Sequence, residues 1–180
     1  MDKNHQSEVA WHLLTVVGED RPGIVAGVTA SLYKGGCNLG ETSMCRLGGL
    51  FTIMMMVSGA VSNEALEAVI QPAVKKFNLR AHVDKTDARL HDHKIPNVQI
   101  TIYGADRAGI VAETVAVLSE SGMDILDLNS DVAGSTEKPV YVLVIDGDAT
   151  QGLDHLKDSL ASLENKGIEI SLTPLETMVG

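Results

Sequence analysis

The sequence predicts an α+β fold built from two copies of one β-α-β-β-α-β unit. Three observations support this prediction. The stretch "GEDRPGIVAGV" at residues 18–28 returns as "GADRAGIVAET" at residues 104–114. Around both stretches, short runs rich in β-branched residues and segments with helical spacing follow one another in the same order. A polar stretch, "KTDARLHDHKIP" at residues 85–96, separates the two copies.

The repeat is extensive enough to define two domains. When the sequence is shifted by 86 positions, ten of the nineteen residues in 18–36 are identical to those in 104–122. With two residues inserted in the second copy, "FTIMMMVSG" at 51–59 also aligns with "PVYVLVIDG" at 139–147. We therefore expect a tail at residues 1–10, a first unit at 11–86, a linker at 87–96 and a second unit at 97–180.

Each unit begins with a strand and a helix. The runs "WHLLTVV" at 11–17 and "VQITIY" at 98–103 are short and β-branched, which is typical of strands. Apolar residues then recur at helical spacing, which predicts a helix in each unit. These residues are Ile24, Val25, Val28 and Leu32 in the first unit and Val111, Val115 and Leu118 in the second. Gly35, Gly36 and Gly122 are expected to end the helices.

Two strands, a second helix and a last strand complete each unit. The paired strands are expected at 38–46 and 50–58, with a tight turn at 47–49, and at 124–132 and 139–146, with a longer turn at 133–139. The second helices are marked by Leu66, Val69, Ile70, Ala73 and Phe77, and by Leu153, Leu156, Leu160 and Leu163. The last strands are expected at 79–85 and 168–175.

This order of elements is typical of a ferredoxin-like unit, in which both helices cover one face of an antiparallel four-stranded sheet. Residues 51–57 and 140–145 are apolar at nearly every position instead of at alternate ones. Such runs indicate burial on both faces of the sheet. We expect the face away from the helices to meet the other unit or a second chain, because a large bare apolar patch is rare on a monomer.

Composition and charge exclude several classes of function. The chain has 14 Lys and Arg against 24 Asp and Glu, a formal net charge of −10. Proteins that bind nucleic acid neutralise its phosphates with basic side chains, so we do not expect this chain to bind DNA directly. The apolar runs are too short to cross a membrane, and the first residues lack the pattern of a signal peptide. We expect a cytoplasmic protein.

The repeated turn has residues suited to a helix start that can bind an anion. Gly18 allows a sharp turn, Asp20 stands where a cap is expected, and Pro22 suits a first helical turn. Gly23 costs helix stability, which suggests that another group approaches closely there. Free N–H groups at such a helix start suit a small anion, including the carboxylate of an amino acid. The alternative is that the turn is only a well-formed helix start, with Asp20 as its cap.

The stretch "DRPGIVAGVTASLYKGGCNLGE" resembles the signature of ACT domains, with a D-R-x-G turn, a helix ending in Gly and a strand that opens with Asn. The resemblance covers nearly the whole chain as two tandem units. It implies a regulatory module of the kind that commonly binds amino acids at interfaces between units. A tandem pair with no enzyme attached is similar to the glycine cleavage system transcriptional repressor family. That similarity implies action through a DNA-binding partner protein, which agrees with the acidic charge.

The resemblance also implies a set of ligand-binding residues. In the first unit these are Gly18, Glu19, Asp20, Arg21, Pro22, Gly23 and Asn38, and in the second Gly104, Asp106, Arg107, Gly109 and Asp124. The amide of Asn38 can meet both an amino and a carboxylate group. Asp124 replaces Asn in the second copy, where it would still bind an amine but would repel a carboxylate. We therefore expect the first copy to be the better ligand site.

Other patterns in the sequence indicate structure more than chemistry. Arg21 and Arg107 can grip a carboxylate, or they can be solvated arginines paired with nearby acidic residues. The "HDH" at 91–93 is better explained as a solvated join than as a metal site, which needs three or four placed ligands. Cys37 and Cys45 would lie about 27 Å apart on one strand, so we expect free thiols, with Cys37 in the core.

Together these observations favour a regulatory protein that binds a small amino acid, with glycine or serine as the suggested ligand. We expect no catalytic residues, no cofactor and no metal, since no titratable cluster or nucleotide-binding motif is found. The expected partners are a protein, in particular a DNA-binding regulator, and further copies of the chain in a homo-oligomer. The alternative is a structural module that drives oligomerisation or regulates an enzyme of amino-acid metabolism.

Overall fold

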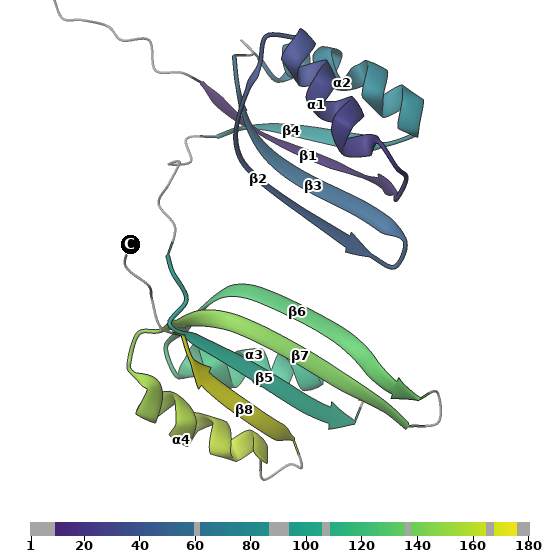
Figure 1. The fold of residues 1–180 in the computed structure, drawn as a ribbon. Helices are drawn as coiled ribbons and strands as arrows, with labels where there is room; N and C mark the ends of the chain where they lie inside the picture. The colour runs from purple at the N-terminus through teal and green to yellow at the C-terminus, as the bar shows by residue number, and fades with distance from the viewer. Residues whose placement is uncertain are drawn as a thin grey trace, which may run out of the picture. The chain divides into compact units, whose positions relative to one another are not determined.

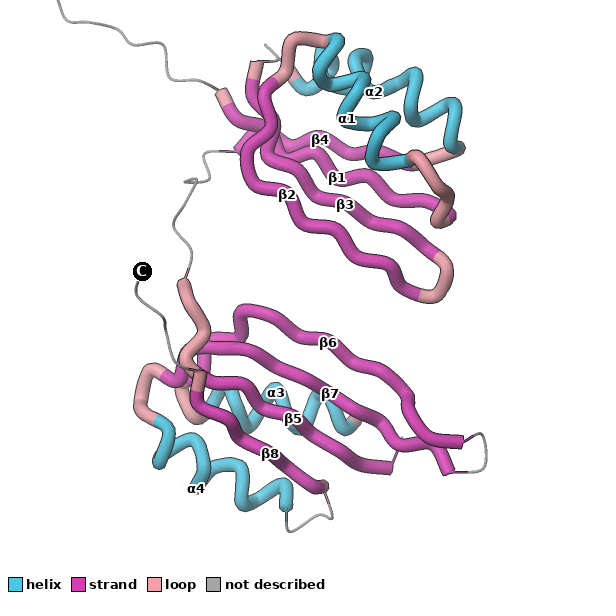
Figure 2. Tube along the Cα trace, viewed as in Figure 1, coloured by secondary structure: helices cyan, strands magenta, loops and turns pink. Residues whose placement is uncertain are grey.

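The computed structural model describes residues 10–59, 62–86, 94–105, 109–135, 138–164 and 168–175. The chain divides into two compact units, Met1–Asp92 and His93–Gly180. Each contains a four-stranded antiparallel sheet with two helices on one face, as Figures 1 and 2 show. The predicted α+β fold of two ferredoxin-like units is therefore confirmed.

The first unit follows the expected order of elements. They are β1 (Trp11–Glu19), α1 (Ile24–Lys34), β2 (Asn38–Leu47), β3 (Leu50–Ser58), α2 (Asn63–Phe77) and β4 (Arg80–Thr86). The strand order in the sheet is β2-β3-β1-β4, so β2 and β4 form its edges.

The second unit repeats this arrangement. Its elements are β5 (Val98–Ala105), α3 (Ile110–Glu120), β6 (Met123–Ser135), β7 (Lys138–Ala149), α4 (Leu153–Glu164) and β8 (Glu169–Pro174). The strand order is β6-β7-β5-β8.

The cores form where the apolar periodicities meet. In β1, Leu14 and Val16 alternate with half-exposed neighbours, and they pack against the helix residues Ile24, Val28 and Leu32. The second unit has an equivalent core between α3, α4 and its sheet. The helix-facing residues of the two central strands of each sheet are thus buried by the helices.

The hairpin of the first unit is tight, as predicted. β2 ends at Leu47 and β3 begins at Leu50, with Gly48 and Gly49 both at positive φ (57° and 79°). Two such residues suit the two-residue turn whose twist matches that of the strands.

The hairpin of the second unit is longer than we expected. β6 continues to Ser135 and β7 begins at Lys138, so most of the predicted turn at 133–139 belongs to strands. In the first unit Gly18 lies opposite Phe51, whereas in the second Gly104 lies opposite Tyr141. Gly18 and Gly104 are 86 positions apart, whereas Phe51 and Tyr141 are 90 apart. The second copy therefore has four extra residues in its hairpin, and the predicted two-residue insertion was wrong. A shift of two residues keeps every side chain on the same face, so the apolar pattern cannot reveal it.

Part of the apolar face away from the helices is covered from within the first unit. Met56 points to that face and is only 8% exposed, whereas Met54 is 43% exposed. The ring of Trp11 lies over Gly40, where an added Cβ would come within 3.0 Å of it. That this face meets another unit or chain stays a prediction.

Candidate functional site

The repeated turn lies between the first strand and the first helix of each unit, where the sequence predicted it. In the first unit Gly18 and Glu19 end β1, and α1 begins only at Ile24. Gly23 is the N-cap of α1 and has a φ of 88°, a conformation that residues with a Cβ rarely adopt. This positive φ, and not a place inside the first helical turn, explains the glycine.

Asp20 is not the cap of α1, contrary to our expectation. The N-cap lies three residues later, and no side chain bonds to the first N–H groups of the helix. Asp20 instead holds the turn to the β2–β3 hairpin. Its backbone N–H donates to the carbonyl oxygen of Gly49 at 2.9 Å, and its carboxylate forms an ion pair with Arg46. Pro22 likewise precedes the helix and does not belong to its first turn.

Arg21 pairs with the neighbouring Glu19. Its Nη2 atom lies 2.6 Å from Oε2 of Glu19, and both side chains are more than half exposed. Such an exposed pair contributes little to stability, about 0–1 kcal/mol. The guanidinium of Arg21 is therefore free to exchange Glu19 for another carboxylate at small cost.

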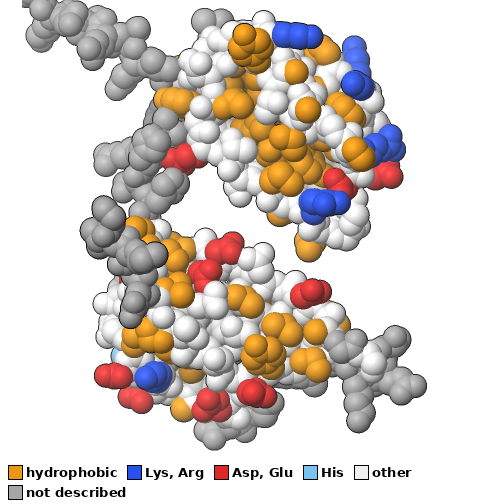
Figure 3. Space-filling view, in the orientation of Figure 1, with side chains coloured by type: hydrophobic (Ala, Val, Ile, Leu, Met, Phe, Trp, Pro, Cys, Tyr) orange, Lys and Arg blue, Asp and Glu red, His pale blue; other side chains and the backbone are white. Residues whose placement is uncertain are grey.

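A hollow of about 460 Å³ opens beside this turn. It is lined by Asp20, Arg21, Pro22, Gly23, Ile24, Val25 and Ala26, and across from them by Met44, Arg46 and Phe51. Figure 3 shows hydrophobic side chains gathered on the first unit between α1 and β2, with charged side chains at the edge of this patch. The hollow thus combines an apolar floor, a helix N-terminus, one carboxylate and two guanidinium groups.

The packing of α1 explains why the hollow stays open. Gly27 lets α1 approach the ring of Phe77 in α2, since a Cβ at Gly27 would lie 2.4 Å from that ring. Because α1 packs against α2, the edge strand β2 keeps its helix-side residues uncovered, and Met44 is 49% exposed. Arg46 was missed by the sequence reasoning, because an isolated arginine on a predicted strand gives no signal of contact with a turn 26 residues earlier.

Asn38 does not lie near the turn of its own unit. It opens β2 opposite Ser58, whereas Gly18 lies opposite Phe51. Phe51 and Ser58 are seven positions apart along β3, which is about 24 Å at about 3.4 Å per residue. One amino acid cannot span this distance, so the predicted first-unit residues form two separate groups at opposite ends of the sheet.

The second unit shares the shape of the turn. Gly109 is the N-cap of α3 with a φ of 91°, and none of the described side chains caps α3. Gly104 lies in β5 opposite Tyr141. The predicted site residues Asp106 and Arg107 lie outside the described part of the chain.

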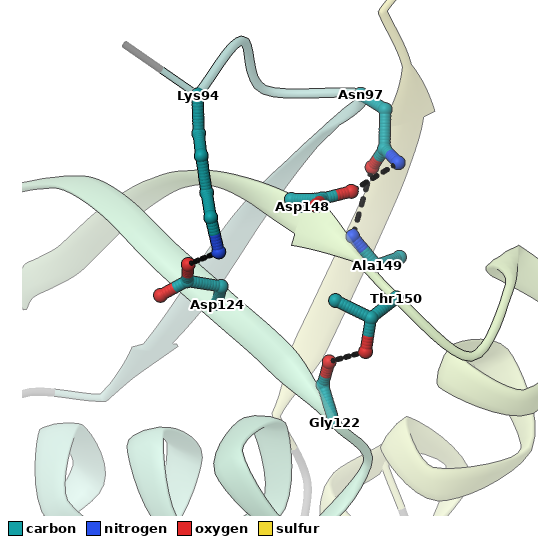
Figure 4. A network of polar contacts seen from close by, with 7 residues as sticks. All are labelled: Lys94, Asn97, Gly122, Asp124, Asp148, Ala149 and Thr150. Carbon is teal, nitrogen blue, oxygen red and sulfur yellow. Dashed lines mark hydrogen bonds and ion pairs between the residues drawn. The ribbon is translucent and has the colours of Figure 1, made fainter. Parts of the chain in front are cut away.

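Asp124 occupies the same place in β6 that Asn38 occupies in β2, and it holds an ammonium group of the chain itself. Nζ of Lys94 lies 2.5 Å from Oδ2 of Asp124, as Figure 4 shows. The hydrogen bond to Asp124 and its negative charge raise the pKa of Lys94, and the charge of Asp148 acts in the same direction. Asp124 is therefore paired within the chain, and binding of a ligand amine by Asp124 stays a prediction.

Asn97 organises the same end of the second sheet. Its Nδ2 donates to Asp148 at 2.7 Å, and its Oδ1 accepts from the N–H of Ala149 at 2.9 Å. The hydroxyl of Thr150 donates to the carbonyl oxygen of Gly122 at 2.6 Å. Figure 4 shows these contacts together with the Lys94–Asp124 pair.

The remaining sequence candidates have structural positions or lie outside the described residues. Cys37 is buried and Cys45 exposed, both as free thiols, and burial raises the pKa of the Cys37 thiol. Among the described residues, no group of three or more His, Cys, Asp or Glu side chains is placed to hold a metal ion. None of the described helices is long and apolar enough to cross a membrane. The "HDH" at 91–93 lies outside the described part.

Comparison with protein families gives a match over most of the chain. The model of the ACT domain matches twice, at residues 12–84 and 97–172. Among curated proteins, the glycine cleavage system transcriptional repressor of Escherichia coli is 28% identical over 119 residues. This match covers 66% of the chain and 63% of that relative, so the similarity spans less than two thirds of the length of the repressor. A UPF0237 protein of Lactococcus lactis is 39% identical over 72 residues, 39% of the chain and 83% of that protein.

Two solved structures share the fold over nearly the whole chain. A protein of unknown function from Galdieria sulphuraria matches with a TM-score of 0.76 and 21% identity, covering 94% of the chain and all of that protein. A candidate glycine cleavage system transcriptional repressor matches with a TM-score of 0.70 and 22% identity, covering 95% and 100%.

Proposed function

The chain belongs to the ACT domain family as a tandem of two ACT units, and from this we propose that it is a non-enzymatic regulatory protein. It binds a small amino acid and passes the signal to a protein partner. The observation that carries this proposal is the hollow beside Asp20 and Arg46, because it offers complementary groups for both charges of an amino acid.

The chemistry of the hollow suits a zwitterion. The uncapped N-terminus of α1 favours a carboxylate, and Arg46 can hold the same carboxylate with two parallel hydrogen bonds. Asp20 can accept the ammonium group. The ligand would replace the Asp20–Arg46 pair with two new charge pairs, while Met44 and Phe51 form the apolar floor beneath it. The turn residues Gly18–Gly23 are the proposed binding residues on the other wall.

The role of Asn38 in this proposal requires a second copy of the chain. Because Asn38 lies about 24 Å from the turn of its own unit, a ligand that contacts both groups must take them from two protomers. The interfaces at which ACT units commonly bind amino acids would provide such a site. A homo-oligomer is therefore part of the proposal.

The first unit is the proposed sensor. The corresponding residue of the second unit, Asp124, already holds the ammonium of Lys94, and its charge would repel a ligand carboxylate. Gly104, Asp106, Arg107, Gly109 and Asp124 remain the proposed residues of a weaker or different second site.

The name of the Escherichia coli relative suggests the biological setting. Glycine or serine is the proposed ligand, a DNA-binding regulator is the proposed partner, and transcription in the cytoplasm is the proposed process. An acidic chain suits action through such a partner better than direct contact with DNA.

Calorimetric titration and thermal shift with the common amino acids test this function. A ligand at one hundred times its Kd should stabilise the protein by about 2.7 kcal/mol. Arg46→Met should abolish the shift, and Arg80→Met, which removes an exposed arginine from β4, should leave it unchanged. If Asn38→Ala also abolishes the shift, the site is shared between protomers. If no amino acid shifts the melting temperature, the sensor function is refuted.

The second candidate is an interaction module that builds an oligomer or docks an enzyme. It is favoured by the exposed apolar residues at the β2–β3 hairpin, where Leu47 is 74% and Leu50 is 52% exposed. This alternative predicts a stable assembly in light scattering and no response to any amino acid.

A further inference from the structure

The two units differ sharply in charge. Residues 97–180 contain 14 Asp and Glu against 4 Lys and Arg, which gives a formal net charge of −10. Residues 11–86 contain 6 Asp and Glu against 7 Lys and Arg. The second unit therefore has a net charge equal to that of the whole chain, although both units share one fold.

Part of this charge lies on the face of the second sheet that points away from α3 and α4. Three apolar side chains lie together on the two central strands there, with Tyr103 on β5 opposite Val142 on β7, and Val144 next on the same face opposite Thr101. Tyr103 is 38% exposed, and Val142 and Val144 are half-buried. We call this face, with its flanking carboxylates, the acidic face.

Carboxylates flank the apolar stripe on both sides. On β6, Asp127 and Asp131 lie opposite Asp146 and Val142 of β7, and on β8, Glu169 lies opposite Tyr103 of β5. All three flanking residues are exposed. Figure 3 shows hydrophobic and acidic side chains side by side on this unit, whose sheet lies in front of α3 in Figure 1.

These carboxylates are held by neutral groups. Asp127 accepts a hydrogen bond from the side-chain amide of Asn129 at 2.6 Å, and Asp146 accepts one from Gln99 at 2.9 Å. Asp131 accepts from the backbone N–H of Val132. Within the described residues, Asp127, Asp131 and Asp146 have no Lys or Arg partner, so their charges are available to a positively charged surface.

The first unit of a second copy supplies only part of that charge on its equivalent face. The equivalent face of the first unit presents Leu13, Thr15 and Met54 on its central strands. On the flanking strand β4, Arg80, His82 and Asp84 follow one another on this face. One arginine followed by an acidic side chain matches the acidic face less well than another protein with basic side chains on both sides of an apolar strip.

We propose that the acidic face is the docking surface for a basic amphipathic helix of the protein partner. A helix is about 10 Å across and strands lie about 4.8 Å apart, so its apolar side covers β5 and β7. Lys or Arg residues on its two flanks then reach the carboxylates of β6 and β8. This inference rests on the proposed function only for the existence of a protein partner.

Fluorescence anisotropy with two labelled peptides tests the proposal on the full chain. One is an 18-residue amphipathic helix of Leu and Lys, and the other is a scrambled peptide of the same composition. The amphipathic peptide should bind at least tenfold more tightly than the scrambled one. The triple variant Asp127→Asn, Asp131→Asn, Glu169→Gln should weaken its binding at least tenfold.

The matched control removes the same charges from α4. The variant Asp154→Asn, Asp158→Asn, Glu164→Gln should change the affinity less than threefold, and circular dichroism should show both triple variants folded. Equal binding of the two peptides, or equal losses in the two triple variants, would overturn the docking surface. Amino-acid binding and peptide preference are both measured on the parent chain in parallel. Amino-acid binding with no peptide preference refutes docking alone, and the absence of amino-acid binding with intact peptide preference refutes the sensor alone.

Discussion

Replacing Thr114 with Val should stabilise the second unit. Thr114 is fully buried in α3, and its hydroxyl has no hydrogen-bond partner in the described part of the chain. The corresponding residue of α1 is Val28, which is 1% exposed in the first core. An unsatisfied buried hydroxyl costs about 1–3 kcal/mol, and Thr and Val have nearly the same helix propensity. We expect the free energy of unfolding of the second unit to rise by about 1–3 kcal/mol.

Scanning calorimetry and urea denaturation of the full chain measure this change. In a unit of roughly 80 residues, each kcal/mol moves the melting temperature by about 4–8 °C. Hydrogen exchange at the amides of α3 and α1 assigns the change to one unit, because slower exchange is expected in α3 alone.

The reverse substitution is the matched control. Val28→Thr places the same unpaired hydroxyl in the first core and should lower the stability of that unit by a similar amount. If Val28→Thr is destabilising while Thr114→Val leaves stability unchanged or lower, the hydroxyl of Thr114 has a partner in solution, and the reasoning is refuted.

Three further substitutions test local features by denaturation. Gly23→Ala should destabilise the first unit by about 1–2 kcal/mol, because Ala resists the left-handed conformation there; no loss would mean that the turn relaxes. Asn97→Ala should cost about 1–2 kcal/mol by leaving Asp148 without its donor, and an unchanged midpoint would contradict this. Hydrogen bonds from its own backbone N–H and from Ser62 lower the pKa of Glu64 below 4.5. The stabilisation that the ionised Glu64 gives the folded chain is therefore present above the pKa of Glu64 in the unfolded chain, and it is lost as the pH falls through the lower pKa in the folded chain. Glu64→Gln should therefore lose less stability on acidification than the parent.

The order of elements could be predicted because local signals and the repeat agree. Val28 and Leu118 lie at helical spacing in the two copies, and the glycines after each helix occur at matching positions. The length of the second hairpin could not be predicted in the same way. Pro139 and Tyr141 both give an acceptable alignment with Phe51, because a strand pattern with a period of two is unchanged by a shift of two.

The candidate site was less predictable, because its contacts join residues that are distant in sequence. The sequence indicates an acidic residue before a helix, and Asp20 fits the usual role of a cap. The positive φ of Gly23 moves the helix start beyond its reach, and Arg46 from the edge strand becomes its partner. The distance between Asn38 and the turn follows from strand register, which no local pattern reports.

A sensor in the first unit can regulate a partner on the second only if the two binding events are coupled. Binding of an amino acid to the hollow must change the affinity of the acidic face for the basic helix. The peptide must then change the affinity for the amino acid by the same factor. A coupling of about 1–3 kcal/mol would appear as a change of about 5–150-fold in both constants. Peptide titrations with and without saturating amino acid, and the converse titrations, measure the two factors. Unequal factors would show that the assembly differs between the two titrations, and factors of one would show that the chain itself transmits no signal.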